Sequence, residues 1–104
     1  MQYTAEQTIR TIADGLRTQS LGDLNFAHIQ RYVERVVTVT EQEIVRAMRH
    51  IAWDAGLIAE PSGAVATAAL LFRQHELPPH RTVVAIISGG NAEPATLLRV
   101  LGSP

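Results

Sequence analysis

The 104-residue sequence contains no cysteine, which excludes disulfide frameworks, thiol nucleophiles and thiolate metal sites. It also contains no lysine, because all nine basic residues are arginines. A chain without lysine cannot form a Schiff base through an ε-amino group, cannot supply the lysine of a phosphate-binding P-loop and cannot use a lysine as a general base. These absences remove several kinds of enzyme chemistry from the chain when it acts alone.

An excess of charge and a long hydrophobic run are both missing. Nine basic and ten acidic residues give a formal net charge of -1, which provides no field for attracting nucleic acid or anionic lipid. Apolar runs such as Val83–Ile87 are far shorter than the roughly 20 residues that cross a bilayer, and no signal-peptide pattern follows Met1. The four histidines lack a metal-ligand spacing. We therefore expect a cytoplasmic protein that binds no nucleic acid, membrane or metal.

The residues that are present predict a small globular domain, since 46% are hydrophobic and 18% are charged. The clearest element is a helix that begins with the capping box Thr40-Glu41-Gln42-Glu43 and ends at Gly56. Its apolar residues recur with the spacing of one buried helix face. They are Ile44, Ala47, Met48, Ile51 and Ala52. Trp53 stands at the edge of this face, and we expect it to pack against the core.

Other segments of the chain predict further helices and two strands. Helices are expected over about 25–34, 64–75 and 92–101, with the Ala-rich 64–75 helix buried on most sides. Val36–Val39 is a short β-branched run, and Thr82–Ile87 is a continuous apolar run typical of a strand that is covered on both faces. Residues 1–10 form a polar lead-in, and residues 11–104 form the domain.

The predicted fold class is α/β: a partial three-layer unit with a few parallel strands covered by helices. Two parallel strands cannot make a self-sufficient sheet, because strands buried on both faces need neighbours. We therefore expect the chain to be part of a larger fold or to complete its sheet with a second copy. Exposed sheet edges favour self-association in either case, so we predict a homodimer.

Three short motifs could carry chemistry. Ser88-Gly89-Gly90-Asn91 lies where a buried strand gives way to a helix, the place where open α/β sheets bind ligands. A tight turn with Asn91 as helix cap explains the same residues. Glu60 lies between an apolar segment and a helix start, where a carboxylate also stabilises the helix dipole. Asp14-Gly15 is a common turn pair. Taken singly, each motif has a structural explanation as well as a functional one.

Four motifs taken together carry a resemblance to a known family. Thr11–Gly22, Val37–Ile44, Glu60–Ala64 and Ser88–Asn91 occur in the order found in the C-terminal part of the serine racemase and threonine (serine) dehydratase family. These are pyridoxal-phosphate enzymes with the tryptophan synthase β-like fold. The resemblance covers about residues 11–101, nearly the whole chain.

The resemblance implies roles for seven residues in cofactor binding. The hydroxyl of Ser88 would hydrogen-bond the pyridine nitrogen, a neutral partner that leaves the ring a mild electron sink suited to losing a β-hydroxyl. Gly89 and Gly90 would let the strand end approach the ring, and Asn91 would fix the turn. The remaining three residues would line the same cleft. They are Glu60, Asp14 and Gly15.

The resemblance also implies what this chain leaves out. The family's Schiff-base lysine and its glycine-rich phosphate cradle lie upstream of the matched region, so the isolated chain should neither catalyse nor hold pyridoxal phosphate stably. The complete enzyme would bind the cofactor and convert a hydroxy-amino-acid substrate, either by elimination to a 2-oxo acid and ammonia or by racemisation. A missing N-terminal portion, or another chain, would supply the lysine. The alternative is a stand-alone, non-catalytic binding or assembly module derived from the same fold.

Overall fold

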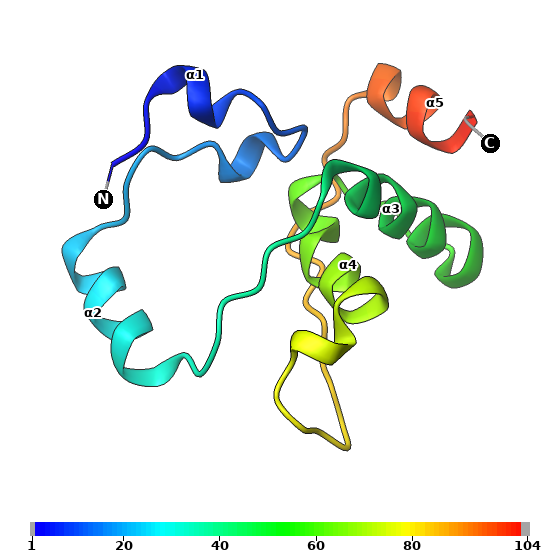
Figure 1. Cartoon of the computed structure of the whole chain (residues 1–104). Helices are drawn as coiled ribbons and strands as arrows, with labels where there is room; N and C mark the ends of the chain where they lie inside the picture. Colours follow the sequence, from blue (N-terminus) through cyan, green and yellow to red (C-terminus); the bar gives the residue numbers. More distant parts are fainter. Residues whose placement is uncertain (1, 103–104) are drawn as a thin grey trace.

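Apart from the segment around Ala13, which belongs to the core, the N-terminal third of the chain lies beside a small helical core (Figure 1). The computed structural model describes residues 2–102. Its radius of gyration is 14.6 Å, whereas a compact chain of this length has about 13 Å. The molecule is flat, with extents of 40 × 38 × 20 Å. The α-helices are α1 (Ala5–Thr8), α2 (Asp23–Tyr32), α3 (Glu41–Ala55), α4 (Val65–Phe72) and α5 (Pro94–Gly102).

Helix α3 confirms the predicted capping box. The Thr40 hydroxyl accepts the Glu43 amide hydrogen at 3.2 Å, and the Glu43 carboxylate accepts the Thr40 amide hydrogen at 2.8 Å. Gly56 ends the helix with a φ of 68°, in the left-handed region that glycine reaches without steric cost. The predicted face is buried except for Ala52, which is half-buried. Short-range sequence signals therefore predicted this helix correctly.

The core lies where α3, α4 and α5 meet. Arg49 of α3 donates its Nε hydrogen to the carbonyl of Val100 at 2.7 Å, and the Arg46 guanidinium stacks over the Phe72 ring at 4.5 Å from its centroid. Five of the nine buried core residues are alanines, so little apolar area is removed from water. The core residues are Ala13, Ile44, Ala47, Met48, Ile51, Ala59, Ala64, Ala68 and Val100.

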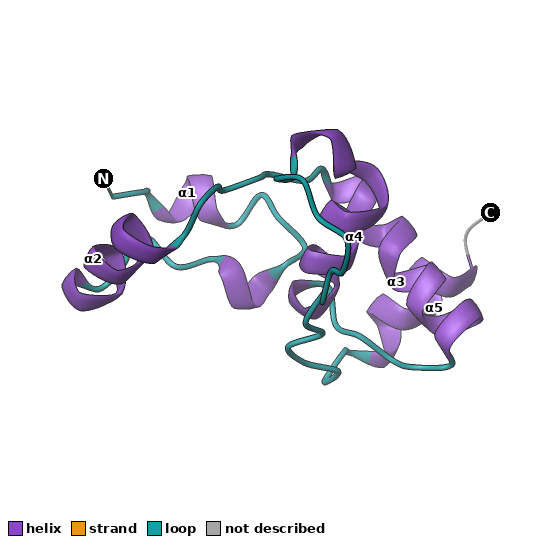
Figure 2. Ribbon diagram, turned by 90° about the horizontal axis from the view of Figure 1, so that it is seen from below, coloured by secondary structure: helices purple, strands orange, loops and turns teal. Residues whose placement is uncertain are grey.

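The two predicted strands are not formed within residues 2–102. Both Val36–Val39 and Thr82–Ile87 run as loops (Figure 2). Burial of the second run is one-sided, since Val84 and Ile86 are 82% and 70% exposed while Ala85 and Ile87 are half-buried. The expectation of parallel strands covered on both faces is therefore wrong for this chain by itself. The physical reason is that neither run has a neighbouring strand to complete a hydrogen-bond ladder.

Two further expectations, on Trp53 and on the 64–75 helix, are corrected by the structure. Trp53 is 72% exposed and does not pack against the core. Helix α4 is shorter than predicted and only partly buried, because Leu71 is exposed. Helix α2 contains no buried residue, although its apolar spacing is helical. These apolar groups face surfaces that nothing in the described part of the chain covers.

No helix among residues 2–102 is long and apolar enough to cross a membrane. Within the polar lead-in, Thr4 caps the short helix α1 through a capping box with Gln7.

An ion pair links α3 to the end of α4 and predicts acid sensitivity. The Arg73 guanidinium donates to the Glu43 carboxylate at 2.7 Å. This bond, followed by the hydrogen bond from the Thr40 amide, lowers the pKa of Glu43, and the same pair raises the pKa of Arg73. A lowered folded-state pKa adds stability above the unfolded value of about 4.3, and this stability is lost as the pH falls through the folded value.

We therefore expect Glu43→Gln to lower the melting temperature by a few degrees at pH 7 and by much less near pH 3. Thermal unfolding followed by circular dichroism at the two pH values measures the difference. Glu34→Gln, at an exposed position, is the matched control and should change little at either pH. If Glu43→Gln lowered the melting temperature equally at both pH values, a contribution of the ion pair to stability would be contradicted.

Candidate functional site

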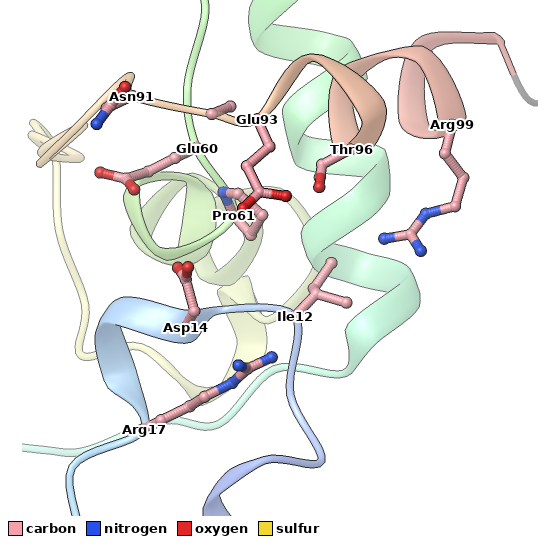
Figure 3. Close-up of a pocket in the computed structure, with 10 residues that line it drawn as sticks. Ile12, Asp14, Arg17, Glu60, Pro61, Asn91, Glu93, Thr96 and Arg99 are labelled. Carbon is pink, nitrogen blue, oxygen red and sulfur yellow. The ribbon is translucent and has the colours of Figure 1, made fainter.

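Residues from three separated segments line one cavity of about 200 Å³. The segments are residues 12–17 around the 3-10 turn Asp14–Leu16, the turn at Glu60-Pro61, and α5 with the loop that precedes it (Figure 3). Three of the predicted site residues, Asp14, Glu60 and Asn91, are among them. The full lining is Ile12, Asp14, Arg17, Glu60, Pro61, Asn91, Ala92, Glu93, Thr96 and Arg99.

The Glu60 turn and the double-glycine segment lie backbone against backbone. The Glu60 amide donates to the carbonyl of Gly89 at 3.1 Å. A Cβ added to Gly63 would overlap that same carbonyl oxygen, and a Cβ added to Gly89 would overlap the Glu60 carboxylate. A Cβ on Gly90 would lie 2.5 Å from the carbonyl oxygen of Ile58. Glycine is therefore required here for close approach.

The Asp14-Gly15 loop is tied to the Glu60 turn by a side chain. The Gly15 amide donates to the Ser62 hydroxyl at 2.8 Å. Upstream, the Ile12 amide donates to the Glu41 carboxylate at 2.8 Å. The Arg17 guanidinium closes the loop on itself by donating to the Thr11 carbonyl at 2.7 and 3.0 Å. All four motifs behind the predicted resemblance therefore meet around one site.

The other predicted residues lie beside the cavity rather than in its wall. Ser88 is exposed, one residue before the Gly89 backbone that contacts Glu60. Gly15 and Gly89 act through their backbones, as described, and Gly90 is exposed. The structure thus brings the seven residues into one region, while their role toward a cofactor stays a prediction.

Sequence reasoning missed four polar residues in the cavity wall, three of which are charged. Arg17 follows the Asp14 turn, Glu93 precedes the proline of α5, and Thr96 and Arg99 lie within α5. The spacing of Glu93, Thr96 and Arg99 by three residues is a signal that could have placed them on one side of a helix. Among residues 2–102, no group of three or more histidine, aspartate or glutamate side chains lies close enough together to hold a metal ion.

Comparisons with known proteins are consistent across sequence and structure. A family model described as "Pyridoxal-phosphate dependent enzyme" matches residues 1–89. An L-threo-3-hydroxyaspartate ammonia-lyase of Saccharomyces cerevisiae is 37% identical over 86 residues, which are 83% of this chain and 26% of that protein. A solved T.th. threonine deaminase superposes with a TM-score of 0.80 at 34% identity, covering 89% of this chain and 30% of that one.

A second solved structure, the serine racemase of Dictyostelium discoideum, has a TM-score of 0.73 at 34% identity over 86% of this chain and 31% of its own. The chain therefore spans about a quarter to a third of the length of the proteins that it matches.

Proposed function

Because this chain belongs to the family of pyridoxal-phosphate dependent enzymes, as its four motifs predicted, we propose that it forms the C-terminal, cofactor-binding portion of an ammonia-lyase or racemase acting on hydroxy-amino acids. The observation that carries the proposal is the meeting of Asp14, Glu60 and Asn91 around one cavity beside Ser88. The names of the relatives, a hydroxyaspartate ammonia-lyase, a threonine deaminase and a serine racemase, support this substrate class.

The residues of this region fit the ring of the cofactor. Ser88 is exposed, and its hydroxyl can donate a hydrogen bond to a pyridine nitrogen without placing a charge beside it. Gly89 and Gly90 leave the backbone next to that hydroxyl free of side chains. When bound, pyridoxal phosphate withdraws electrons from the substrate carbon that loses its proton. In the proposal Ser88 orients the ring, Asn91 fixes the turn, and Glu60, Asp14 and Gly15 form the polar side of the cleft.

In the proposal, residues 11–104 form the domain and residues 1–10 form a lead-in to it. The covalent chemistry of the cofactor is assigned to polypeptide outside the domain. No lysine is present, so the covalent attachment of the cofactor must come from elsewhere. In the complete enzyme Val36–Val39 and Thr82–Ile87 become parallel strands of a layer covered by helices. The exposed side chains of Val84 and Ile86 would then be buried, either by the lysine-bearing portion or in a homodimer. We place this enzyme in the cytoplasm.

The absence of lysine also supports a second proposal: a stand-alone binding or assembly module that is not catalytic. The two proposals differ in whether a lysine-bearing portion exists. Reading the coding sequence around this segment for such a portion, and for a glycine-rich loop, separates them.

Replacement of Ser88 tests the main proposal in the complete enzyme. Loss of one hydrogen bond between neutral groups costs about 0.5–1.5 kcal/mol, so Ser88→Ala is expected to lower kcat/KM by roughly 2- to 10-fold. Release of ammonia and of the 2-oxo acid from serine or threonine measures this. Ser88→Thr retains the hydroxyl and should recover much of the rate. Ser20→Ala, at an exposed serine, is the control. Unchanged kinetics in Ser88→Ala would refute the role of this hydroxyl.

A further inference from the structure

Two hydrogen bonds between residues far apart in sequence fix the loop that carries Asp14. The carboxylate of Glu41, in the first turn of α3, accepts the Ile12 amide hydrogen at 2.8 Å across 29 residues. The hydroxyl of Ser62 accepts the Gly15 amide hydrogen at 2.8 Å across 47 residues. These bonds lie on either side of Asp14, so they set both ends of the segment from which its carboxylate projects into the cavity (Figure 3).

The Ser62 side chain lies close enough to Gly15 that a side chain added there would crowd it. A Cβ on Gly15 would lie 2.9 Å from the Ser62 hydroxyl oxygen and 3.2 Å from its Cβ. Ser62 follows Glu60 by two residues, and Gly15 follows Asp14 by one. The hydrogen bond therefore joins the two carboxylate-bearing segments directly, next to the residues that line the cavity.

The loop has one buried anchor and an exposed remainder. Ala13 is 1% exposed and belongs to the core, whereas Asp14 and Gly15 are exposed. Burial of Ala13 holds the loop near the core but does not fix the direction in which the following residues run. An exposed backbone segment with few apolar contacts opens easily unless hydrogen bonds hold it. Local bonds, such as those from Arg17 to the Thr11 carbonyl, hold the loop in shape, whereas the bonds to Glu41 and Ser62 tie it to α3 and to the Glu60 turn.

We propose that Ser62 and Glu41 are positioning residues, which hold the Asp14-Gly15 loop against the Glu60 turn so that both carboxylates face the cofactor cleft. This inference rests on the proposed function, because it assumes that the cleft receives pyridoxal phosphate. Neither side chain lines the cavity. Their effect on the cofactor passes through the position of the loop, and a chemically conservative replacement at either site should preserve it.

Amide hydrogen exchange measures the two hydrogen bonds in the chain itself. Ser62→Ala is expected to speed exchange of the Gly15 amide by roughly fivefold, the effect of losing about 1 kcal/mol of hydrogen-bond stabilisation, and Ser62→Thr should restore protection. Glu41→Ala should likewise speed exchange of the Ile12 amide, and Glu41→Gln should restore its protection. The Met48 amide in α3 is an internal reference that should not change, which shows that the variants remain folded. Gly15 exchange unaffected by Ser62→Ala would overturn the proposal.

Pyridoxal phosphate titrated into the cofactor-free complete enzyme measures the consequence for the cleft. Ser62→Ala is expected to raise the dissociation constant roughly fivefold, with recovery in Ser62→Thr and no change in the control Ser20→Ala. Faster Gly15 exchange with an unchanged dissociation constant would overturn the positioning role. The unsubstituted enzyme is titrated first, and its failure to bind pyridoxal phosphate would instead overturn the proposed function. The two failures are thereby distinguished.

Discussion

Gly63→Ala is expected to destabilise the fold by about 3 kcal/mol, at the upper end of the range for overpacked positions. The added Cβ would overlap the carbonyl oxygen of Gly89 and lie 3.0 Å from its amide nitrogen. Both are backbone atoms, which cannot rotate away as the end of a flexible side chain can. The same carbonyl accepts the Glu60 amide hydrogen, so relief of the overlap would break the contact that joins the two motifs.

The measurement for Gly63→Ala is thermal or urea unfolding of the chain. In a domain of this size a loss of about 3 kcal/mol lowers the melting temperature by roughly 12 °C or more. Gly102→Ala is the matched control, because nothing lies within 4 Å of its added Cβ and the residue is helical. It should be neutral or slightly stabilising. If Gly63→Ala melted at the temperature of Gly102→Ala, the close packing of the two motifs would be disproved.

A third glycine separates crowding from backbone strain. Gly56 has a φ of +68° and open space around it, so Gly56→Ala is strained without any overlap and should cost about 1–2 kcal/mol. A smaller effect at Gly56 than at Gly63 would show that backbone contact, rather than conformation alone, holds the Glu60 turn beside the double glycine.

The sequence correctly predicted those parts of the fold that depend on residues close to one another along the chain. The capping box at Thr40 and the apolar spacing after it involve residues within a few positions of one another, and α3 forms as expected. The runs at 36–39 and 82–87 have no neighbouring strand within residues 2–102, so their composition predicted strands that the described part of the chain does not form. The prediction that Trp53 packs against the core failed for a similar reason, because no described element covers its side of α3.

The residues of the candidate site also differ in whether the sequence could predict their place. Asp14, Glu60 and Asn91 were each ambiguous as isolated turns, and only the resemblance assigned them to one cofactor site; the structure brings them around one cavity, and their role toward a cofactor stays a prediction. Arg17 and Glu93 were missed because their place in the cavity wall depends on where the loop and α5 pack. Ser62 was part of a recognised motif, but the contact that defines its proposed role spans 47 residues. No local pattern contains that information.

Incubation of the chain with pyridoxal phosphate, followed by borohydride reduction, is expected to leave every internal residue unmodified. Reduction fixes only an imine, and all nine basic side chains are arginines, whose guanidinium groups do not form one. Peptide mapping by mass spectrometry should find the added mass on the peptide that carries the α-amino group alone. Absorbance at about 410 nm should be correspondingly small, since the lysine side chains that normally anchor this cofactor are absent.

Arg81→Lys makes that negative result informative. Arg81 is exposed, so the substitution presents one ε-amino group to solvent without disturbing the core, and its peptide should then carry the label. A reduced adduct on an internal peptide of the unsubstituted chain would show that an unforeseen nucleophile holds the cofactor. In the complete enzyme the same digest is expected to place the label on a lysine outside residues 11–104, because these residues supply a hydroxyl, carboxylates and a glycine-lined backbone but no amine. The digest therefore locates the covalent partner that the proposed cleft requires.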